Sequence, residues 1–126
     1  SATQGKGLIQ LIAPLPNEAE IMLTWSQVLA PSGWPLHGLG VLPVVCTSLG
    51  PEVMAAGLAG LGAGMAPMAA ALDRKRAART PVPAAEAAAL RGACPPAEGR
   101  ATDLVAARAL IDNPRAYAAA LATMGR

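Results

Sequence analysis

The sequence predicts a mixed α/β chain whose strands come first and whose helices come second. Its composition changes near residue 50: apolar runs separated by Pro- and Gly-rich turns give way to a region dominated by alanine. We therefore expect residues 1–50 to form a β-hairpin and loops, and residues 51–126 to be helical. A length of 126 residues corresponds to one domain or part of one.

Two apolar runs, residues 8–15 and 21–30, flank the turn-forming Pro16-Asn17-Glu18 and predict a β-hairpin. The second run alternates between an apolar and a mixed face, Ile21, Leu23 and Trp25 against Met22, Thr24 and Ser26. This alternation is typical of a half-buried strand. Residues 31–40 contain too many Pro and Gly residues for a regular element, so we expect a shaped loop there.

Capping signals predict the first three helices of the second half. Pro51 can begin a helix, and a second helix, carrying Met65, Met68 and Leu72, should end in a basic cluster. A short third helix should start at Pro83 and close at Gly92.

Two further helices are expected near the end of the chain. Thr102 is a suitable N-cap for the fourth helix, and its buried face should carry Leu104, Leu110 and Ile111. Asn113-Pro114 predicts an N-cap followed by proline at the first helical position. The packing face of this fifth helix should consist of Tyr117, Leu121 and Met124.

The charge pattern argues against a nucleic-acid partner. The net charge is only +2, and the one basic cluster lacks interleaved aromatic residues, so we interpret it as a solvated helix end: Arg74, Lys75, Arg76 and Arg79. Residues 53–72 carry no charge and have the length of a membrane span. However, they are mostly Ala and Gly and are interrupted by Pro67, which favours two short packed helices over a span.

The two cysteines, Cys46 and Cys94, are far apart and show no metal-binding spacing, and His37 is the only histidine. The sequence therefore predicts no metal site and no cofactor. Two interpretations of the cysteines stay open: a pair of small buried thiols, or a Cys46–Cys94 disulfide that would imply an oxidising compartment. The chain also begins without Met and without a signal-type stretch, which leads us to expect a fragment or a processed chain.

Gly5-Lys6-Gly7, just ahead of the first apolar run, is the most unusual short stretch. It does not fit a phosphate-binding loop, because that motif needs an earlier glycine and a Ser or Thr after the lysine. A lysine can act as a general base if desolvation lowers its pKa and a partner orients it. Gln10 is the candidate partner, although a straight strand would place it about 13 Å away. From the residues alone, a lysine in a surface turn is the favoured interpretation.

Five motifs in order resemble the C-terminal part of the catalytic domain of C-terminal processing (tail-specific) serine peptidases. They fall on Gly5-Lys6-Gly7 with Gln10, Leu23-Thr24, Pro31-Ser32-Gly33, Gly38-Leu39-Gly40-Val41, and Pro43. The resemblance covers about forty-five residues. Beyond residue 50 the likeness is loose, and it is found mainly in the stretch DLVAARAL.

This resemblance implies a partial crotonase/ClpP-like, β-rich core segment followed by Ala-rich helices. It also implies a serine–lysine peptidase in which Lys6 is the general base and Gln10 orients it. The nucleophilic serine would come from a preceding segment, so no nucleophile is assigned within the chain, and the chain alone is expected to be inactive. The expected partners are a polypeptide substrate and the remainder of the peptidase chain. The family's usual location would be periplasmic or secreted.

Two departures from the family pattern keep alternatives open. Val44 stands after Pro43 where the family commonly has Asp, and Trp34-Pro35 replaces polar residues after the Pro-Ser-Gly motif. Ser32 and His37 do not form a convincing catalytic pair, because no acidic residue between Glu20 and Glu52 could orient the histidine. The main alternative is a non-catalytic binding module derived from the same fold, and a further one is a membrane-associated helical protein.

Overall fold

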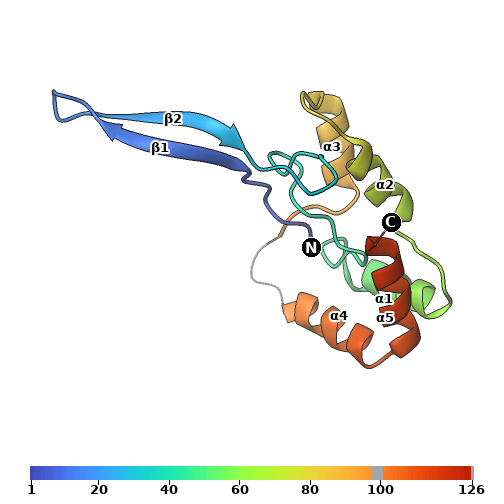
Figure 1. The fold of residues 1–126 in the computed structure, drawn as a ribbon. Helices are drawn as coiled ribbons and strands as arrows, with labels where there is room; N and C mark the ends of the chain where they lie inside the picture. Colours follow the sequence, from blue (N-terminus) through green and yellow to red (C-terminus); the bar gives the residue numbers. More distant parts are fainter. Residues whose placement is uncertain (98–100, 126) are drawn as a thin grey trace.

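The computed structural model describes residues 1–97 and 101–125 of the chain. Two strands, β1 (Leu8–Pro14) and β2 (Glu20–Gln27), form a hairpin that extends from a helical body as a long arm (Figure 1). The body contains the helices α1 (Pro51–Gly62), α2 (Ala69–Ala77), α3 (Ala84–Gly92), α4 (Ala101–Ile111) and α5 (Pro114–Met124). The predicted mixed α/β composition, with strands first and helices second, is thus confirmed.

The arm is an antiparallel pair, as the sequence predicts. Its turn is closed by backbone hydrogen bonds between Leu15 and Ala19 and between Glu18 and Leu15, and Glu18 has a left-handed φ of 64°. The register shifts between Ile9 and Gln10, so Trp25 has no direct partner on β1. The register pairs Leu11 with Leu23 and Ala13 with Ile21, so these four apolar side chains share one face of the arm.

The expectation of a half-buried strand is wrong for this structure. Trp25 is 70 % exposed, Leu11 56 % and Leu23 47 %. No helix of the described residues packs on the arm, whose contacts are between its own two strands. Nothing within residues 1–97 and 101–125 covers these apolar side chains.

The main core lies where the loop after the arm meets the helices. It combines residues from both halves of the chain: Ala2, Leu42, Val44, Val45, Cys46, Leu61, Ala71, Leu72, Cys94, Ala116 and Ala120. A smaller cluster of Leu39, Ala78 and Leu90 joins the loop to α2 and α3. The boundary near residue 50 therefore separates the kinds of secondary structure but not the packing, because both halves build one core.

The helix ends follow several of the predicted signals. Pro51 starts α1, Pro83 immediately precedes α3, and Gly92 ends α3. Asn113 caps α5, since its Oδ1 accepts a hydrogen bond of 3.1 Å from the Ala116 N–H. The predicted N-cap Thr102 is wrong, because α4 begins at Ala101 and Thr102 lies inside the helix.

The packing faces of α4 and α5 also differ from the prediction. Of the predicted α4 face, Leu110 packs against the main core, but Leu104 and Ile111 are 70 % and 69 % exposed, and the buried residue of α4 is Ala106. On α5 the predicted face of Tyr117, Leu121 and Met124 is exposed, and Ala116, Ala120 and Thr123 are buried instead. The helices α1, α4 and α5 pack together with Leu61 and small residues such as Ala116 and Ala120 in their core, and the small side chains allow close helix approach.

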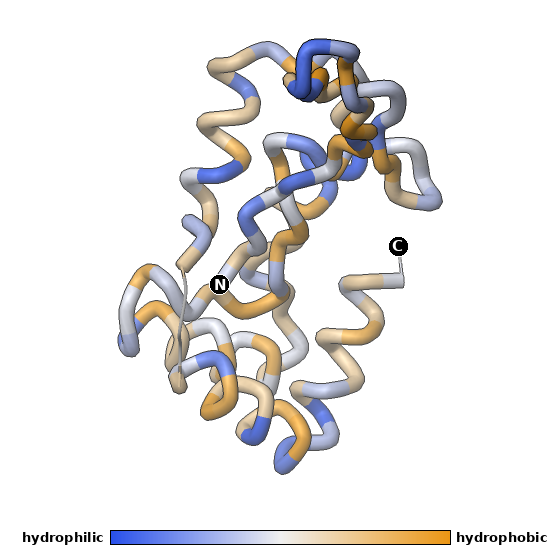
Figure 2. Tube along the Cα trace, turned by 90° about the vertical axis from the view of Figure 1, so that its left-hand side faces the viewer, coloured by the Kyte–Doolittle hydropathy of each residue, from blue (hydrophilic) through white to orange (hydrophobic). Residues whose placement is uncertain are grey.

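Residues 53–72 are divided between two helices, as expected, but Met65 and Met68 lie ahead of the second helix instead of on it, so the prediction that it carries them is wrong. The helix α1 ends at Gly62 and α2 begins at Ala69, with Pro67 in the connection. Figure 2 shows that, along the whole chain, hydrophobic stretches are interrupted by intermediate and hydrophilic ones. Within the described residues no helix has the length and apolar character needed to cross a membrane.

Candidate functional site

The Gly5-Lys6-Gly7 stretch lies directly against the backbone of the loop that follows the arm. A Cβ atom on Gly7 would lie 2.5 Å from the His37 backbone nitrogen, and one on Gly5 would lie 2.5 Å from that of Gly40. Gly5 also has a φ of 78°, in the region that favours glycine. Both glycines are therefore required by close backbone approach.

Two backbone hydrogen bonds hold this stretch in place. The Gly38 N–H donates to the Gly5 carbonyl at 2.9 Å, and the Val28 N–H donates to the Gly7 carbonyl at 2.8 Å. Lys6 itself is exposed, and within residues 1–97 and 101–125 its ammonium has no hydrogen-bond or ion-pair partner. The structure thus displays an unpaired lysine on a backbone fixed on both sides.

Gln10, the predicted partner of Lys6, lies on β1 next to the register shift. Its Nε2 donates a hydrogen bond of 3.1 Å to Thr24 Oγ1 on β2, and it makes no hydrogen bond to Lys6. Gln10 and Thr24 belong to two of the motifs that carry the family resemblance. The structure brings these two side chains together and leaves Lys6 apart from them.

The loop of residues 36–40 is held from its other side by two cations of the helical body. The Arg91 side chain on α3 donates to the carbonyls of Gly38, at 2.9 Å, and Gln4, at 3.1 Å. The Lys75 ammonium on α2 donates to the carbonyls of Leu39, at 3.1 Å, and Gly40. Three successive carbonyls, those of residues 38–40, therefore accept from buried or half-buried cations.

Lys75 is 3 % exposed, so its interpretation as part of a solvated basic helix end is wrong. The ammonium also lies 4.8 Å from the centre of the Trp34 ring, in cation–π geometry. Burial, together with the positive charge of Arg91, lowers the pKa of Lys75 to about 8. A signal was present in the sequence, because Lys75 follows Leu72 by three residues and Ala71 by four and so shares their buried face.

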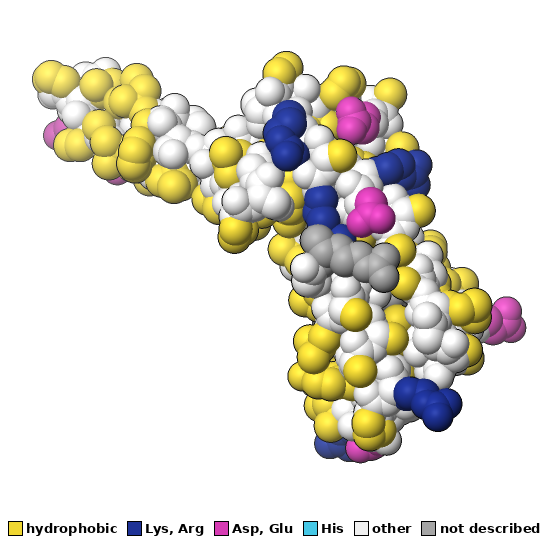
Figure 3. All heavy atoms as spheres, turned by 45° about the vertical axis from the view of Figure 1, so that its right-hand side comes forward, with side chains coloured by type: hydrophobic (Ala, Val, Ile, Leu, Met, Phe, Trp, Pro, Cys, Tyr) yellow, Lys and Arg dark blue, Asp and Glu magenta, His cyan; other side chains and the backbone are white. Residues whose placement is uncertain are grey.

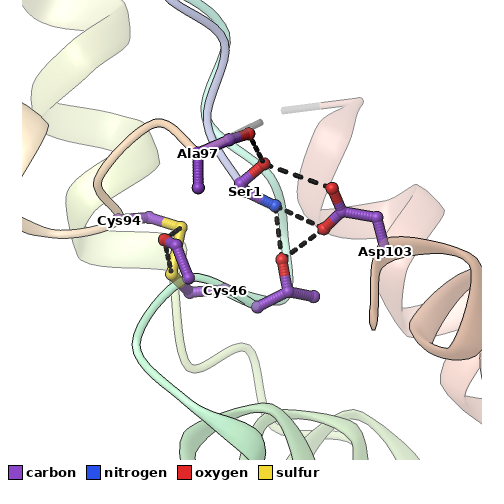
Figure 4. A network of polar contacts seen from close by, with 7 residues as sticks. Ser1, Cys46, Cys94, Ala97 and Asp103 are labelled. Carbon is purple, nitrogen blue, oxygen red and sulfur yellow. Dashed lines mark hydrogen bonds and ion pairs between the residues drawn. A yellow bond between two sulfur atoms is a disulfide. The ribbon is translucent and has the colours of Figure 1, made fainter. Parts of the chain in front are cut away.

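Cys46 and Cys94 form a disulfide, which settles the two interpretations of the cysteines for this structure. Both are buried, and the bond ties the loop before α1 to the segment after α3. The Ser48 hydroxyl lies 3.3 Å from the Cys46 sulfur and 3.4 Å from the Cys94 sulfur. Figure 4 shows the disulfide beside a polar network that includes Ser1 and Asp103.

That network joins the first residue to α4. The Ser1 amino group lies 2.8 Å from Asp103 Oδ1 and 2.6 Å from Thr47 Oγ1, and Thr47 Oγ1 donates to the same carboxylate oxygen. The Ser1 hydroxyl also lies 3.2 Å from Asp103 Oδ2. The amino group of Ser1, and then the Thr47 hydroxyl, lower the pKa of Asp103.

The serine and histidine of the loop do not form a catalytic pair with Lys6. Ser32 is exposed beside Trp34 and Lys75, where it lines a cavity. His37 is exposed, and its backbone nitrogen lies against Gly7. No hydrogen bond of the described residues connects Ser32, His37 and Lys6.

The arm next to Lys6 is an extended apolar surface. Apolar side chains cover the face seen in Figure 3, and between Gly7 and Gln27 the only charged residues are Glu18 and Glu20 near the tip. Both outer strand edges of the arm are unpaired within the described residues. Such an edge together with an apolar face is a template for pairing with further polypeptide.

Comparison with known proteins finds no family model, no curated protein and no solved structure that matches this chain. The resemblance to C-terminal processing peptidases thus stays a prediction from the motifs of residues 5–43.

Proposed function

We propose that this chain contributes the general-base lysine and part of the core to a serine–lysine endopeptidase of the C-terminal processing type. Lys6 is the base in this proposal, and Gln10 orients it by exchanging its hydrogen bond to Thr24 for one to Lys6. The nucleophilic serine is supplied by polypeptide outside these 126 residues. The chain by itself is inactive.

The observation that carries the proposal is that the backbone around Lys6 is held in place while its side chain stays free. Gly5 and Gly7 fix its backbone against residues 36–40, while its side chain has no partner among the described residues. A lysine that is only an exposed surface residue does not need two flanking glycines in backbone contact with a second segment. A general base does need a fixed backbone and a free amine, because proton transfer requires close and repeatable geometry.

The apolar arm supports the second part of the proposal. Lys6 lies at the base of the arm, so polypeptide that covers the arm and pairs with its edges would also come close to Lys6. Covering the arm would also desolvate the region around this lysine. Desolvation favours the neutral amine, which is the form that a general base requires.

The proposed fold is the crotonase/ClpP-like core of this peptidase family, of which the arm and its loop would form an edge. The disulfide fits the periplasmic or secreted location of the proposed family, because such bonds persist in oxidising compartments. A polypeptide is the proposed substrate. No nucleic acid and no cofactor take part in the proposed reaction.

The experiment is hydrolysis of an unstructured polypeptide by the native protein that contains this chain, compared with its Lys6→Ala variant. Loss of the general base should lower kcat/KM by about 10²–10⁴-fold, the usual contribution of a positioned acid–base group. Gln10→Ala should lower kcat by a smaller factor. Arg115→Ala, which removes an exposed cation on α5, is the matched control and should leave the rate unchanged. Wild-type activity in the Lys6→Ala variant would overturn the assignment.

A non-catalytic binding module is the second candidate, and the exposed arm is the observation that favours it. The same apolar face and free edges could serve to hold another polypeptide without any reaction. The absence of peptide hydrolysis by the native protein, combined with stable binding that Trp25→Ser abolishes, would favour this function over the peptidase.

A further inference from the structure

A cavity of about 320 Å³ opens between the loop after the arm and α2, on the far side of residues 38–40 from the Gly5-Lys6-Gly7 stretch. Its apolar walls come from Trp34, Val41, Leu42, Leu72 and Met124. The volume lies at the lower end of the range for small-molecule sites. The cavity is therefore large enough for a compact organic ligand.

The charged residues that line the cavity are both cations. Lys75 lines the cavity while its ammonium donates to the carbonyls of Leu39 and Gly40, and the Arg76 guanidinium donates to the carbonyls of Thr123 and Met124. No acidic residue is among the lining residues that the structure describes. Asp73 is bonded to Arg76 at 3.2 Å from the solvent side, and it does not line the cavity.

Two positive charges beside an apolar wall are an electrostatic cost for the protein when the cavity holds only water. For Lys75 the cost of burial is visible in its pKa, which desolvation and then the charge of Arg91 lower to about 8. An anion in the cavity would interact with both charges in a partly desolvated setting, where such attraction is stronger than in water. The apolar wall would at the same time favour a ligand with a hydrocarbon part.

We propose that this cavity is a binding site for a small carboxylate that carries an apolar group, with the carboxylate near Lys75 and Arg76 and the apolar group against Trp34 and Leu72. The site is independent of the proposed peptidase chemistry, because none of its residues is Lys6 or Gln10. Ser32, at the rim of the cavity, supplies a hydroxyl that can donate to the same carboxylate.

Trp34 fluorescence provides a direct readout. The chain has two tryptophans, and Trp25→Phe removes the one on the arm, outside the cavity. In this background, at low micromolar protein, hexanoate is titrated at pH 7 with hexanamide and inorganic phosphate as the comparison probes. The proposal expects a saturable change with hexanoate and a clearly weaker response to both other probes. No response to hexanoate, or equal affinity for hexanamide, would overturn the proposal. Equal affinity for phosphate would overturn the claim that the apolar group of the ligand contributes to binding.

Two variants test the cations separately. Arg76→Gln and Lys75→Met should each weaken hexanoate binding by about tenfold, the effect of losing one charge-assisted contact. Arg115→Gln, on an exposed cation outside the cavity, should leave the affinity unchanged. If Lys75→Met fails to fold, Arg76→Gln decides, since Arg76 is only half-buried. Unchanged affinity in Arg76→Gln would overturn the proposal.

A pH titration is an independent test of the role of Lys75. Between pH 7 and 9.5 Lys75 should lose its proton, because its pKa is about 8. Its charged neighbours are Arg91 on α3 and Arg76 beside it on α2. The loop presents only carbonyls and Trp34 to the ammonium. Hexanoate affinity should therefore fall severalfold in the parent chain and stay constant in Lys75→Met, and a pH-independent affinity in the parent would contradict the role of Lys75.

Discussion

At the scale of single residues, the two glycines beside Lys6 are determined by backbone contact rather than by solvent exposure. The backbone nitrogens of His37 and Gly40 occupy the space that a side chain at position 7 or 5 would need. Position 40 is equally constrained, since a Cβ there would clash with the Thr3 carbonyl. The stretch of residues 3–7 and the loop of residues 36–41 therefore form one fixed unit.

This close approach leads to the first prediction. Gly7→Ala should lower the free energy of unfolding by roughly 1–3 kcal/mol, because two backbone segments must separate to admit the methyl group. Gly92→Ala is the matched control, since nothing lies within 4 Å of a Cβ at that position. Urea unfolding measures both. Equal stability of the Gly7→Ala and Gly92→Ala variants would show that residues 5–7 do not touch the loop.

Lys75 gives a prediction with a defined sign. Its pKa is about 8 in the folded chain and 10.5 as the ordinary value, so the unfolded chain binds more protons between these limits. Stability should therefore rise with pH from about 8 to 10.5, by roughly 3 kcal/mol in total from this group.

The measurement is the free energy of unfolding in urea at pH 7 and pH 10. Lys75→Met should remove most of the increase, while Lys6→Met, at the only other lysine, should keep it. A stability that is flat or falls over this range in the parent chain would contradict the burial of Lys75.

At the scale of elements, the sequence predicted the existence of the strands and helices better than their packing faces. Pro51, Pro83, Gly92 and the Asn113 cap act locally, within a few residues of the boundary that they set. The faces of α4 and α5 were predicted from the large apolar residues. In an alanine-rich chain these faces are chosen instead by how closely helices approach, so Ala106, Ala116 and Ala120 are buried while Leu104 and Ile111 stay exposed.

The candidate site shows the same limit of sequence information. The Gly-Lys-Gly pattern could be singled out, but its reason, contact with residues 36–40, depends on a fold of the loop that no local rule supplies. The bond between Gln10 and Thr24 depends on the strand register, which shifts at Ile9. Lys75 was predicted to be on the surface because it is charged, although its spacing from Leu72 places it on the same helix face.

The N-cap of α5 gives an element-scale prediction. Asn113→Ala should lower the free energy of unfolding by about 1 kcal/mol, because the Ala116 N–H loses its acceptor. Asn113→Asp or Asn113→Ser should retain most of the stability, since both side chains can accept the same bond. Thermal unfolding of the three variants checks this, and an Asn113→Ala variant as stable as the parent would exclude the cap.

At the scale of the whole molecule, the arm and the body differ in how much of their apolar surface is buried. The body buries its core through the loop, the disulfide and the packed helices. The arm exposes an apolar face and two free strand edges, which favour association with other chains. We expect the isolated chain to associate, or to be only marginally stable, at concentrations where the arm finds other copies.

Sedimentation of the isolated chain over a range of concentrations checks this expectation. Replacing Leu23 and Trp25 together by lysine should restore a monomer, because the charges oppose stacking of the apolar faces. Leu104→Lys on α4, which changes a side chain that is also 70 % exposed, should not restore it. A sharp, reversible thermal transition from a monomer of the unmodified chain would contradict the prediction.

The most direct test of the central claim is to acylate the native protein that contains this chain with a serine-directed peptidase inhibitor and to locate the modified residue by mass spectrometry. The account predicts one modified serine outside these 126 residues, and a loss of that modification in the Lys6→Ala variant. Equal modification in the Lys6→Ala variant, or no modified serine in the parent, would contradict the assignment of Lys6 as the general base.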